Sequence, residues 1–138
     1  MDNCIFCQII SGQIPSSKVY EDDDVLAFLD ITQTTKGHTL LIPKKHVRNV
    51  LEMDEKTAEK TFSKLPKVAK AVQKATKAKG VNIINNNEEI AGQTVFHAHI
   101  HIVPRFDEKD GISINYTTHE PDFEELAQLA NTIQKEVD

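Results

Sequence analysis

Three histidines that alternate with apolar residues, in the segment His97-Ala98-His99-Ile100-His101, constrain this chain most strongly. The 138 residues contain only six histidines, so chance rarely places three of them in such a row. Side chains of a β-strand point alternately to opposite faces, which would put the three imidazoles on one face and the apolar residues on the other. The pattern predicts a strand over residues 94–104 with an apolar back and an imidazole front.

Three kinds of function fit an imidazole-rich strand face. The face could simply be exposed to solvent, although histidine forms strands less readily than threonine or valine. The imidazoles could bind a catalytic metal ion, but zinc enzymes with His-x-His strands use further His, Asp or Glu ligands, and no Asp-His pair occurs in Ile102–Arg105. One neutral imidazole could instead attack as a covalent nucleophile while its other nitrogen donates to a carbonyl or carboxylate. A neighbouring imidazole could then protonate the leaving group.

The tripeptide Gly92-Gln93-Thr94 directly precedes the histidine segment. A glycine lets the backbone approach a ligand closely, and the Gln and Thr side chains offer neutral donors to phosphate oxygens. Taken alone, this tripeptide would usually be only a turn. Joined to the histidine segment, it is far more specific.

Length and charge limit the class of protein. A chain of 138 residues suits one compact domain. The formal net charge of −5 argues against a nucleic-acid polymer as partner, because such proteins usually have a basic face, whereas a small nucleotide needs only a local anion site. No apolar run approaches a membrane span, and Met1–Cys4 lacks the features of a signal peptide. We therefore expect a cytoplasmic protein with reduced thiols.

The hydrophobic pattern predicts an α+β fold of mainly antiparallel strands with one central and one terminal helix. Strands are expected at residues 17–20, 25–30, 38–43, 81–84 and 94–104. The acidic residues 21–24 separate the first two strands, which indicates a hairpin. The polar and weakly patterned residues 107–118 are expected to form a loop.

Both helices have recognisable ends. Asp54 is the expected N-cap of the central helix, which Pro66 should kink or split and Gly80 should end. The terminal helix opens with Pro121 and acidic residues, which favour a helix start. The expected apolar stripes are Ala58, Phe62, Leu65, Val68, Ala69 and Val72 in the central helix, and Phe123, Leu126, Ala130, Ile133 and Val137 in the terminal one.

A second group of reactive residues is the motif Cys4-Ile5-Phe6-Cys7. Its spacing lets both sulfur atoms reach one tetrahedral metal ion. The same spacing is compatible with redox chemistry or with two buried thiols. A thioredoxin-like pair should follow a strand within a βαβ pattern, which the sequence does not show here. A zinc ion would need two further ligands.

One segment resembles the signature of the histidine-triad (HIT) family of nucleotide hydrolases and transferases. It is Gly92-Gln93-Thr94-Val95-Phe96-His97-Ala98-His99-Ile100-His101-Ile102-Val103. The similarity continues through residues 4–7, 20–23, 27–31 and 37–46. It implies a single HIT-like domain over residues 1–138, with its core at 4–105 and a helical extension at about 119–138.

The resemblance implies a role for each matching residue. His99, the middle histidine, would attack the α-phosphate and carry the nucleoside monophosphate, with His101 and His38 completing the site. The implied nucleotide contacts are Asp30 at the ribose, Gln93, Thr94 and Asn86 near the phosphates, and Ile5, Phe6, Phe28 and Ile31 around a purine. Phosphoryl transfer depends mainly on positioning and on donors aimed at the phosphate oxygens. Because no Walker-type glycine loop or acidic magnesium site is visible, we expect no catalytic metal.

The resemblance also supplies the missing metal ligands. Cysteine-bearing HIT proteins add the histidine of Pro-Lys-Lys-His and the first triad histidine, here His46 and His97, to the pair Cys4 and Cys7. Two thiolates and two neutral imidazoles would form a closed structural zinc site, as in a zinc-binding bacterial-type member. His119 lies in a polar segment and is expected to be solvent-exposed.

Three functions stay open within this resemblance. Hydrolysis of an adenosine phosphoramidate is favoured, with dinucleoside polyphosphate hydrolysis as the alternative, since both use the same catalytic residues. A nucleotide-binding regulatory module that acts through partners is the third. HIT proteins are usually homodimers, and the amphipathic helices could bury such an interface.

Overall fold

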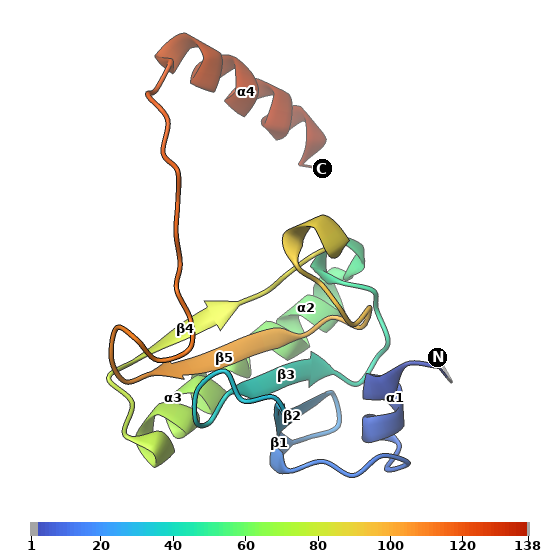
Figure 1. The fold of residues 1–138 in the computed structure, drawn as a ribbon. Coiled ribbons are helices and arrows are strands. Elements are labelled where there is room, and N and C mark those ends of the chain that lie inside the picture. Colours follow the sequence, from blue (N-terminus) through green and yellow to red (C-terminus); the bar gives the residue numbers. More distant parts are fainter. Residues whose placement is uncertain (1–2, 138) are drawn as a thin grey trace.

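The computed structural model of the protein describes residues 3–137 and contains a five-stranded sheet with the order β1-β2-β3-β5-β4 (Figure 1). Neighbouring strands are antiparallel throughout. The strands are β1 (Lys18–Glu21), β2 (Val25–Leu29), β3 (Thr39–Pro43), β4 (Gly80–Ile84) and β5 (Ile100–Arg105). The expected hairpin joins β1 to β2, and the predicted α+β fold is confirmed.

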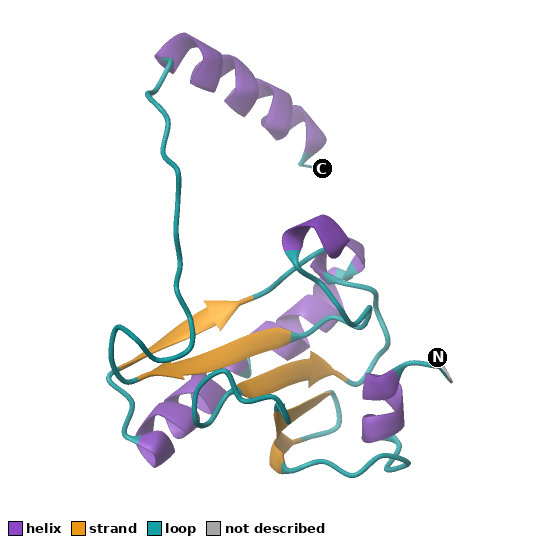
Figure 2. Ribbon diagram, viewed as in Figure 1, coloured by secondary structure: helices purple, strands orange, loops and turns teal. Residues whose placement is uncertain are grey.

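Helices pack on both faces of the sheet (Figure 2). On one face, α2 (Glu55–Phe62) and α3 (Leu65–Thr76) cover a core that includes Val25 and Ala27 of β2. On the other face, α1 (Ile5–Ile10) covers a second core that includes Leu26 and Phe28 of the same strand. Because β2 is apolar on both faces, it holds α1, and with it the cysteine pair, against the sheet.

Pro66 splits the central helix in two. α2 ends at Phe62, and α3 begins at Leu65 with the proline in its first turn, where the missing N–H costs no hydrogen bond. Asp54 caps α2 as expected, because its carboxylate accepts a hydrogen bond from the backbone N–H of Thr57 at 2.9 Å.

Two details expected of the central helix are wrong. The chain leaves α3 after Thr76 through a left-handed residue, Lys77 with φ 61°, so the helix ends before Gly80, which begins β4. Phe62 is 37% exposed, whereas its neighbour Thr61 is buried. Successive residues of a helix are about 100° apart, and Thr57 and Thr61 occupy the face of α2 that is turned inward.

The predicted strand over residues 94–104 is wrong in its first half. β5 begins only at Ile100, and residues 93–99 run from the short 3-10 helix η2 (Glu89–Ala91) to the sheet without regular structure. This segment is held by loops instead of a strand ladder, since the N–H of Ala98 donates to the carbonyl of Val47 at 2.8 Å. Consequently only His101 of the three histidines lies in a strand.

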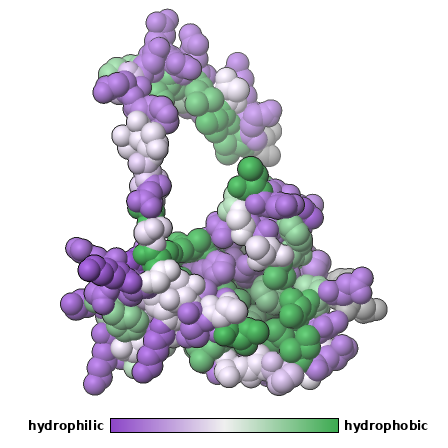
Figure 3. Space-filling view, viewed as in Figure 1, coloured by the Kyte–Doolittle hydropathy of each residue, from purple (hydrophilic) through white to green (hydrophobic). Residues whose placement is uncertain are grey.

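The chain ends in an arm that leaves the sheet. Residues 106–122 contain neither helix nor strand, in agreement with the loop expected at 107–118, and lead to α4 (Phe123–Glu136). This helix stands apart from the sheet in Figure 1, and all of its residues are exposed. Figure 3 shows apolar side chains gathered on the side of α4 that is turned toward the rest of the molecule. His119, within the arm, is exposed as expected.

Within residues 3–137, no helix combines the length and the apolar character needed to cross a membrane.

Candidate active site

A cavity of about 340 Å³ opens between α1, the end of β2 and the segment that leads into β5. Its volume falls in the range of small-molecule sites. The lining includes these candidates from the sequence: Ile5, Phe6, Phe28, Asp30, Ile31, Thr94, His99 and His101. An apolar slot thus lies beside two imidazoles and a carboxylate, which suits a flat base joined to a sugar phosphate.

The His99 ring has a defined tautomer. Its Nδ1 lies 2.7 Å from the carbonyl oxygen of His97, and because a carbonyl can only accept, Nδ1 must carry the proton. The lone pair is therefore on Nε2, the nitrogen through which a neutral imidazole attacks. The ring is 6% exposed and packs edge-on against Phe6, with 5.1 Å between ring centroids.

A second chain of contacts orients His101. The backbone N–H of Thr34 donates to Nδ1 of His38 at 3.3 Å, so the proton of the His38 ring is on Nε2. That nitrogen donates to Nδ1 of His101 at 3.0 Å. The His101 proton is then left on Nε2. Its ring centroid lies 5.1 Å from that of His99, which suits a proton donor to the leaving group.

Burial keeps these imidazoles neutral near pH 7. It lowers the pKa of His99 below its ordinary value of 6.5. It also lowers the pKa of His101 to about 4, and the neighbouring rings of His99 and His38 act in the same direction. The pKa of His38 is lowered by burial too, while the Asp30 carboxylate, 3.7 Å away, opposes that shift. A neutral nucleophile is the form that can attack phosphorus.

Asp30 is held in a loop at the end of β2. One carboxylate oxygen accepts hydrogen bonds from the backbone N–H and the hydroxyl of Thr32, both at 2.8 Å. The other oxygen faces His38. Ile31 lines the rim of the cavity, since its side chain is 96% exposed. A ligand in the cavity would therefore cover Ile31.

Gln93 and Asn86 lie outside the cavity lining. The Gln93 side chain is 2% exposed and forms hydrogen bonds within the protein. Its Nε2 donates to the carbonyls of Arg48 and Val95 at 2.7 and 3.0 Å. Its oxygen accepts from the backbone N–H of Glu88 at 2.8 Å. This glutamine holds the loop in shape, and its phosphate contact stays a prediction.

Asn85 is a site residue that sequence reasoning missed. Its Nδ2 donates to the carbonyl of His99 at 2.9 Å, which fixes the backbone of the candidate nucleophile. The sequence feature that could have indicated this role is the run Asn85-Asn86-Asn87 before the glycine turn. Asparagine side chains often form hydrogen bonds with the backbone of irregular segments.

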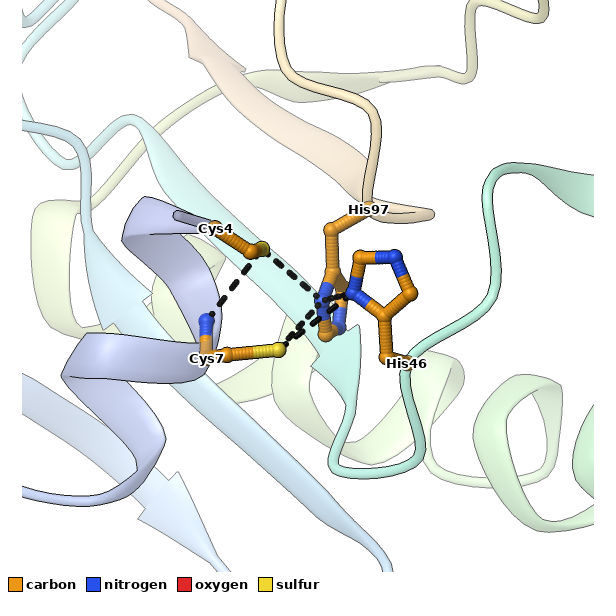
Figure 4. A group of neighbouring side chains, drawn as sticks. All are labelled: Cys4, Cys7, His46 and His97. Atoms are coloured by element: carbon orange, nitrogen blue, oxygen red, sulfur yellow. Dashed lines mark hydrogen bonds between the residues drawn. The ribbon is translucent and has the colours of Figure 1, made fainter. Parts of the chain in front are cut away.

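The second cluster joins α1 to the two loops that carry His46 and His97 (Figure 4). Nδ1 of His97 lies 3.5 Å from the Cys4 sulfur and 3.6 Å from the Cys7 sulfur. Nδ1 of His46 lies 3.3 Å from the Cys7 sulfur and 3.2 Å from Nδ1 of His97. All four donor atoms lie within 4.8 Å of one another.

These spacings fit a tetrahedral zinc ion. Zn–S bonds of about 2.3 Å and Zn–N bonds of about 2.0–2.1 Å place the corners of a tetrahedron about 3.3–3.8 Å apart. Nε2 of His97 lies 2.8 Å from the Pro43 carbonyl and donates to it, which leaves Nδ1 unprotonated for a metal. Burial and the adjacent Cys4 raise the pKa of the Cys7 thiol to about 11, so a thiolate here calls for a cation.

A sequence model of the HIT domain matches residues 11–108, which include β1 to β5 and the histidine segment. The chain belongs to the HIT family.

Three relatives show how far the similarity extends. "Protein hit" of Bacillus subtilis is 51% identical over 136 residues, 97% of this HIT protein and 94% of the relative. A crystal structure of a Streptococcus mutans protein is 65% identical and superposes with a TM-score of 0.96, covering 100% of this chain and 87% of that one. Adenosine 5'-monophosphoramidase HNT1 of Saccharomyces cerevisiae is 40% identical over 126 residues, 91% of this chain and 77% of the relative.

Proposed function

We propose that this HIT protein hydrolyses or transfers purine nucleotides at the α-phosphate through a covalent nucleotidyl-His99 intermediate. One observation carries the proposal: the Nδ1–H of His99 is bonded to the His97 carbonyl, so Nε2 offers a lone pair at a nucleotide-sized cavity. The yeast relative, named adenosine 5'-monophosphoramidase, favours an adenosine phosphoramidate as substrate. Dinucleoside polyphosphate hydrolysis is the alternative.

The geometry supports two displacements at phosphorus. In the first, Nε2 of His99 forms a bond to phosphorus and the bond from phosphorus to the leaving nitrogen breaks. The departing amine takes a proton from His101, whose protonated form the negative charge of the bound phosphate favours, and His101 is left neutral. The resulting positive charge on the His99 ring is shared with the His97 carbonyl. In the second, water attacks phosphorus and returns a proton to His101, and the P–N bond to His99 breaks. The products are the free amine and the nucleoside monophosphate.

The decisive experiment uses both substrate classes. Purified protein is mixed with an adenosine phosphoramidate or a diadenosine polyphosphate, quenched within milliseconds, and its intact mass is recorded. We expect one added AMP moiety that peptide mapping places on His99, and faster turnover of the phosphoramidate. AMP binding without adduct or turnover of either compound would refute the enzyme and favour the regulatory module.

We further propose that Cys4, Cys7, His46 and His97 hold a structural zinc ion. The four donor atoms lie within 4.8 Å of one another, which supports a single shared ion, and a site with four protein ligands leaves no open position for substrate. When bound, zinc would tie α1 to the loops of His46 and His97. The chemistry at phosphorus is assigned to imidazoles alone. The cytoplasmic location stays a prediction consistent with two free thiols.

A homodimer is part of the same proposal. Within residues 3–137 nothing covers the apolar stripe of α4, because no α4 residue is buried. Isolated helices of this length are marginal in water, so a second copy that covers the stripe would stabilise it. Four large residues of the stripe, Phe123, Leu126, Ile133 and Val137, are exposed, and exposed Leu129 lies beside them.

A further inference from the structure

Glu88 has a backbone conformation that side chains rarely adopt. It lies between β4 and η2 with φ 77° and ψ 157°, a region that glycine occupies with much less strain. A turn that needed only this conformation would be better served by glycine. The presence of glutamate instead indicates that its carboxylate has a task, because such strain persists only where the surroundings determine it.

The Glu88 carboxylate is bound by two residues of the loop after His46. Arg48 donates from Nε and Nη2 at 2.7 and 2.8 Å, which is a bidentate pair. Nδ2 of Asn49 donates to the same carboxylate at 2.6 Å. Arg48 and then Asn49 lower the pKa of Glu88 to about 2, so the carboxylate stays charged at neutral pH.

The Glu88 network, defined as Arg48, Asn49, Glu88 and Gln93, leads into the segment of the catalytic histidine. Asn49 is fully buried and donates to the Gln93 oxygen at 3.1 Å, where the Glu88 N–H also donates. Gln93 in turn donates to the carbonyls of Arg48 and Val95. The network therefore closes a ring of bonds between the loop at 48–49 and the start of the segment 93–99.

A second set of bonds reaches the same segment from the other side of Glu88. Its neighbour Asn87 donates to the Asn85 side-chain oxygen at 2.7 Å, and Asn85 donates to the His99 carbonyl. Segment 93–99 has no strand ladder, so these side chains replace one. The carbonyl of His97 that sets the His99 tautomer lies within this segment.

We propose that the Glu88–Arg48 pair is a positioning device for His99: it holds segment 93–99 so that the His97 carbonyl meets Nδ1 and Nε2 stays available. This inference rests on the proposed function. Neither residue lines the cavity, so the pair acts through the backbone and not by touching substrate. Arg48 and Glu88 are 44% and 41% exposed, and exposed ion pairs contribute little to stability, so a purely stabilising role explains the strain poorly.

Three variants test the pair. Glu88→Gln keeps the shape but loses the charge, Glu88→Gly relieves the backbone and removes the carboxylate, and Arg48→Lys keeps the charge without the bidentate contact. Glu21→Gln is the matched control, because Glu21 also binds two cations, Lys18 and Lys44 at 2.8 and 2.9 Å, away from the site. Single-turnover rate, AMP affinity, melting temperature and the ¹⁵N shifts of the His99 ring are measured.

We expect Glu88→Gln to slow the single turnover about tenfold and Glu88→Gly about a hundredfold, since small misplacements cost rates of this size. AMP affinity should stay within about twofold, and the His99 nitrogens should show a mixture of tautomers. Glu21→Gln should change none of these. A Glu88→Gly protein with wild-type rate and a single His99 tautomer would overturn the inference. If the wild-type protein proves inactive, the ¹⁵N shifts still decide about the pair, so the two proposals fail separately.

Discussion

Nδ1 of His99 donates a hydrogen bond to the carbonyl oxygen of His97, two residues earlier, at 2.7 Å. This contact depends on the irregular backbone of segment 93–99, because in an extended strand the carbonyl and the side chain would not turn toward each other. His97 thus contributes to both clusters of side chains. Its ring belongs to the Cys4–Cys7–His46 cluster, and its carbonyl sets the proton position on the candidate nucleophile.

Replacement of the nucleophile should separate binding from chemistry. We expect His99→Ala to lower kcat by about 10³-fold or more, because the first displacement has no other nucleophile. AMP affinity should change by less than about threefold, since the apolar slot and Asp30 remain. Stopped-flow turnover and calorimetric AMP titration measure the two effects. A variant that still turned over at a tenth of the wild-type rate would contradict the covalent route.

The bond from His38 to His101 should matter for proton donation. His38→Leu removes the N–H that donates to Nδ1 of His101, so the His101 proton is no longer confined to Nε2. We expect kcat to fall about a hundredfold with little change in AMP affinity. The loss should be smaller for a substrate whose leaving group needs no proton, such as a nitrophenyl ester of AMP. Equal losses for both substrates would show that His38 acts in another way.

Acid should destabilise the protein through His101. Its folded-state pKa is about 4, below the ordinary 6.5 of the unfolded chain, so the unfolded state binds more protons between these values. The free energy of unfolding should therefore fall as the pH is lowered from about 6.5 toward 4. Urea unfolding across this range should show a shallower fall in His101→Asn than in wild type. His119→Asn, at an exposed position, is the control and should follow the wild-type curve.

Local patterns predicted most of the fold because they report local physics. Asp54 caps α2, Pro66 divides the helix, and the apolar runs become strands within a residue or two of their expected ends. The first half of the strand expected at 94–104 is absent, because alternation alone does not show whether a neighbouring strand is available to pair with it. Segment 93–99 is bonded to groups such as the Val47 carbonyl and the Asn85 side chain, which lie near it only in the folded chain.

The sequence predicted some residues of the two candidate sites but not others. The spacing of Cys4 and Cys7 was compatible with a metal but left redox chemistry and buried thiols open. His46 and His97 followed only from the family resemblance, since they are 39 and 90 residues away from Cys7. Nothing in the sequence indicated that Gln93, expected near the phosphates, is also buried in the loop. Glu88 gave no signal at all, because a strained backbone is invisible in a sequence.

Removal of zinc should loosen the amino-terminal helix. We expect the purified protein to contain one zinc ion per chain, and chelation to lower its melting temperature by about 5–10 °C, because the ion's binding energy contributes to folding. Cys7→Ser should lose the metal, whereas His119→Ala should keep it. Metal content by mass spectrometry and thermal unfolding check both statements. A fully metal-free wild type with unchanged stability after chelation would refute the structural zinc.

The terminal helix should control the oligomeric state. Leu126 and Ile133 are 52% and 55% exposed on the stripe of α4, and burying the exposed half of each against a second copy would contribute about 1 kcal/mol. We expect wild type to sediment as a dimer and Leu126→Glu/Ile133→Glu to dissociate at least about a hundredfold more readily. Gln128→Glu adds a charge on the opposite side of the helix and should remain dimeric. Since the stripe lies outside the sheet, the melting temperature of the sheet core should be the same in the monomeric variant as in wild type. A wild type that sediments as a monomer, or a double variant that dimerises as tightly as Gln128→Glu, would show that α4 does not join two copies.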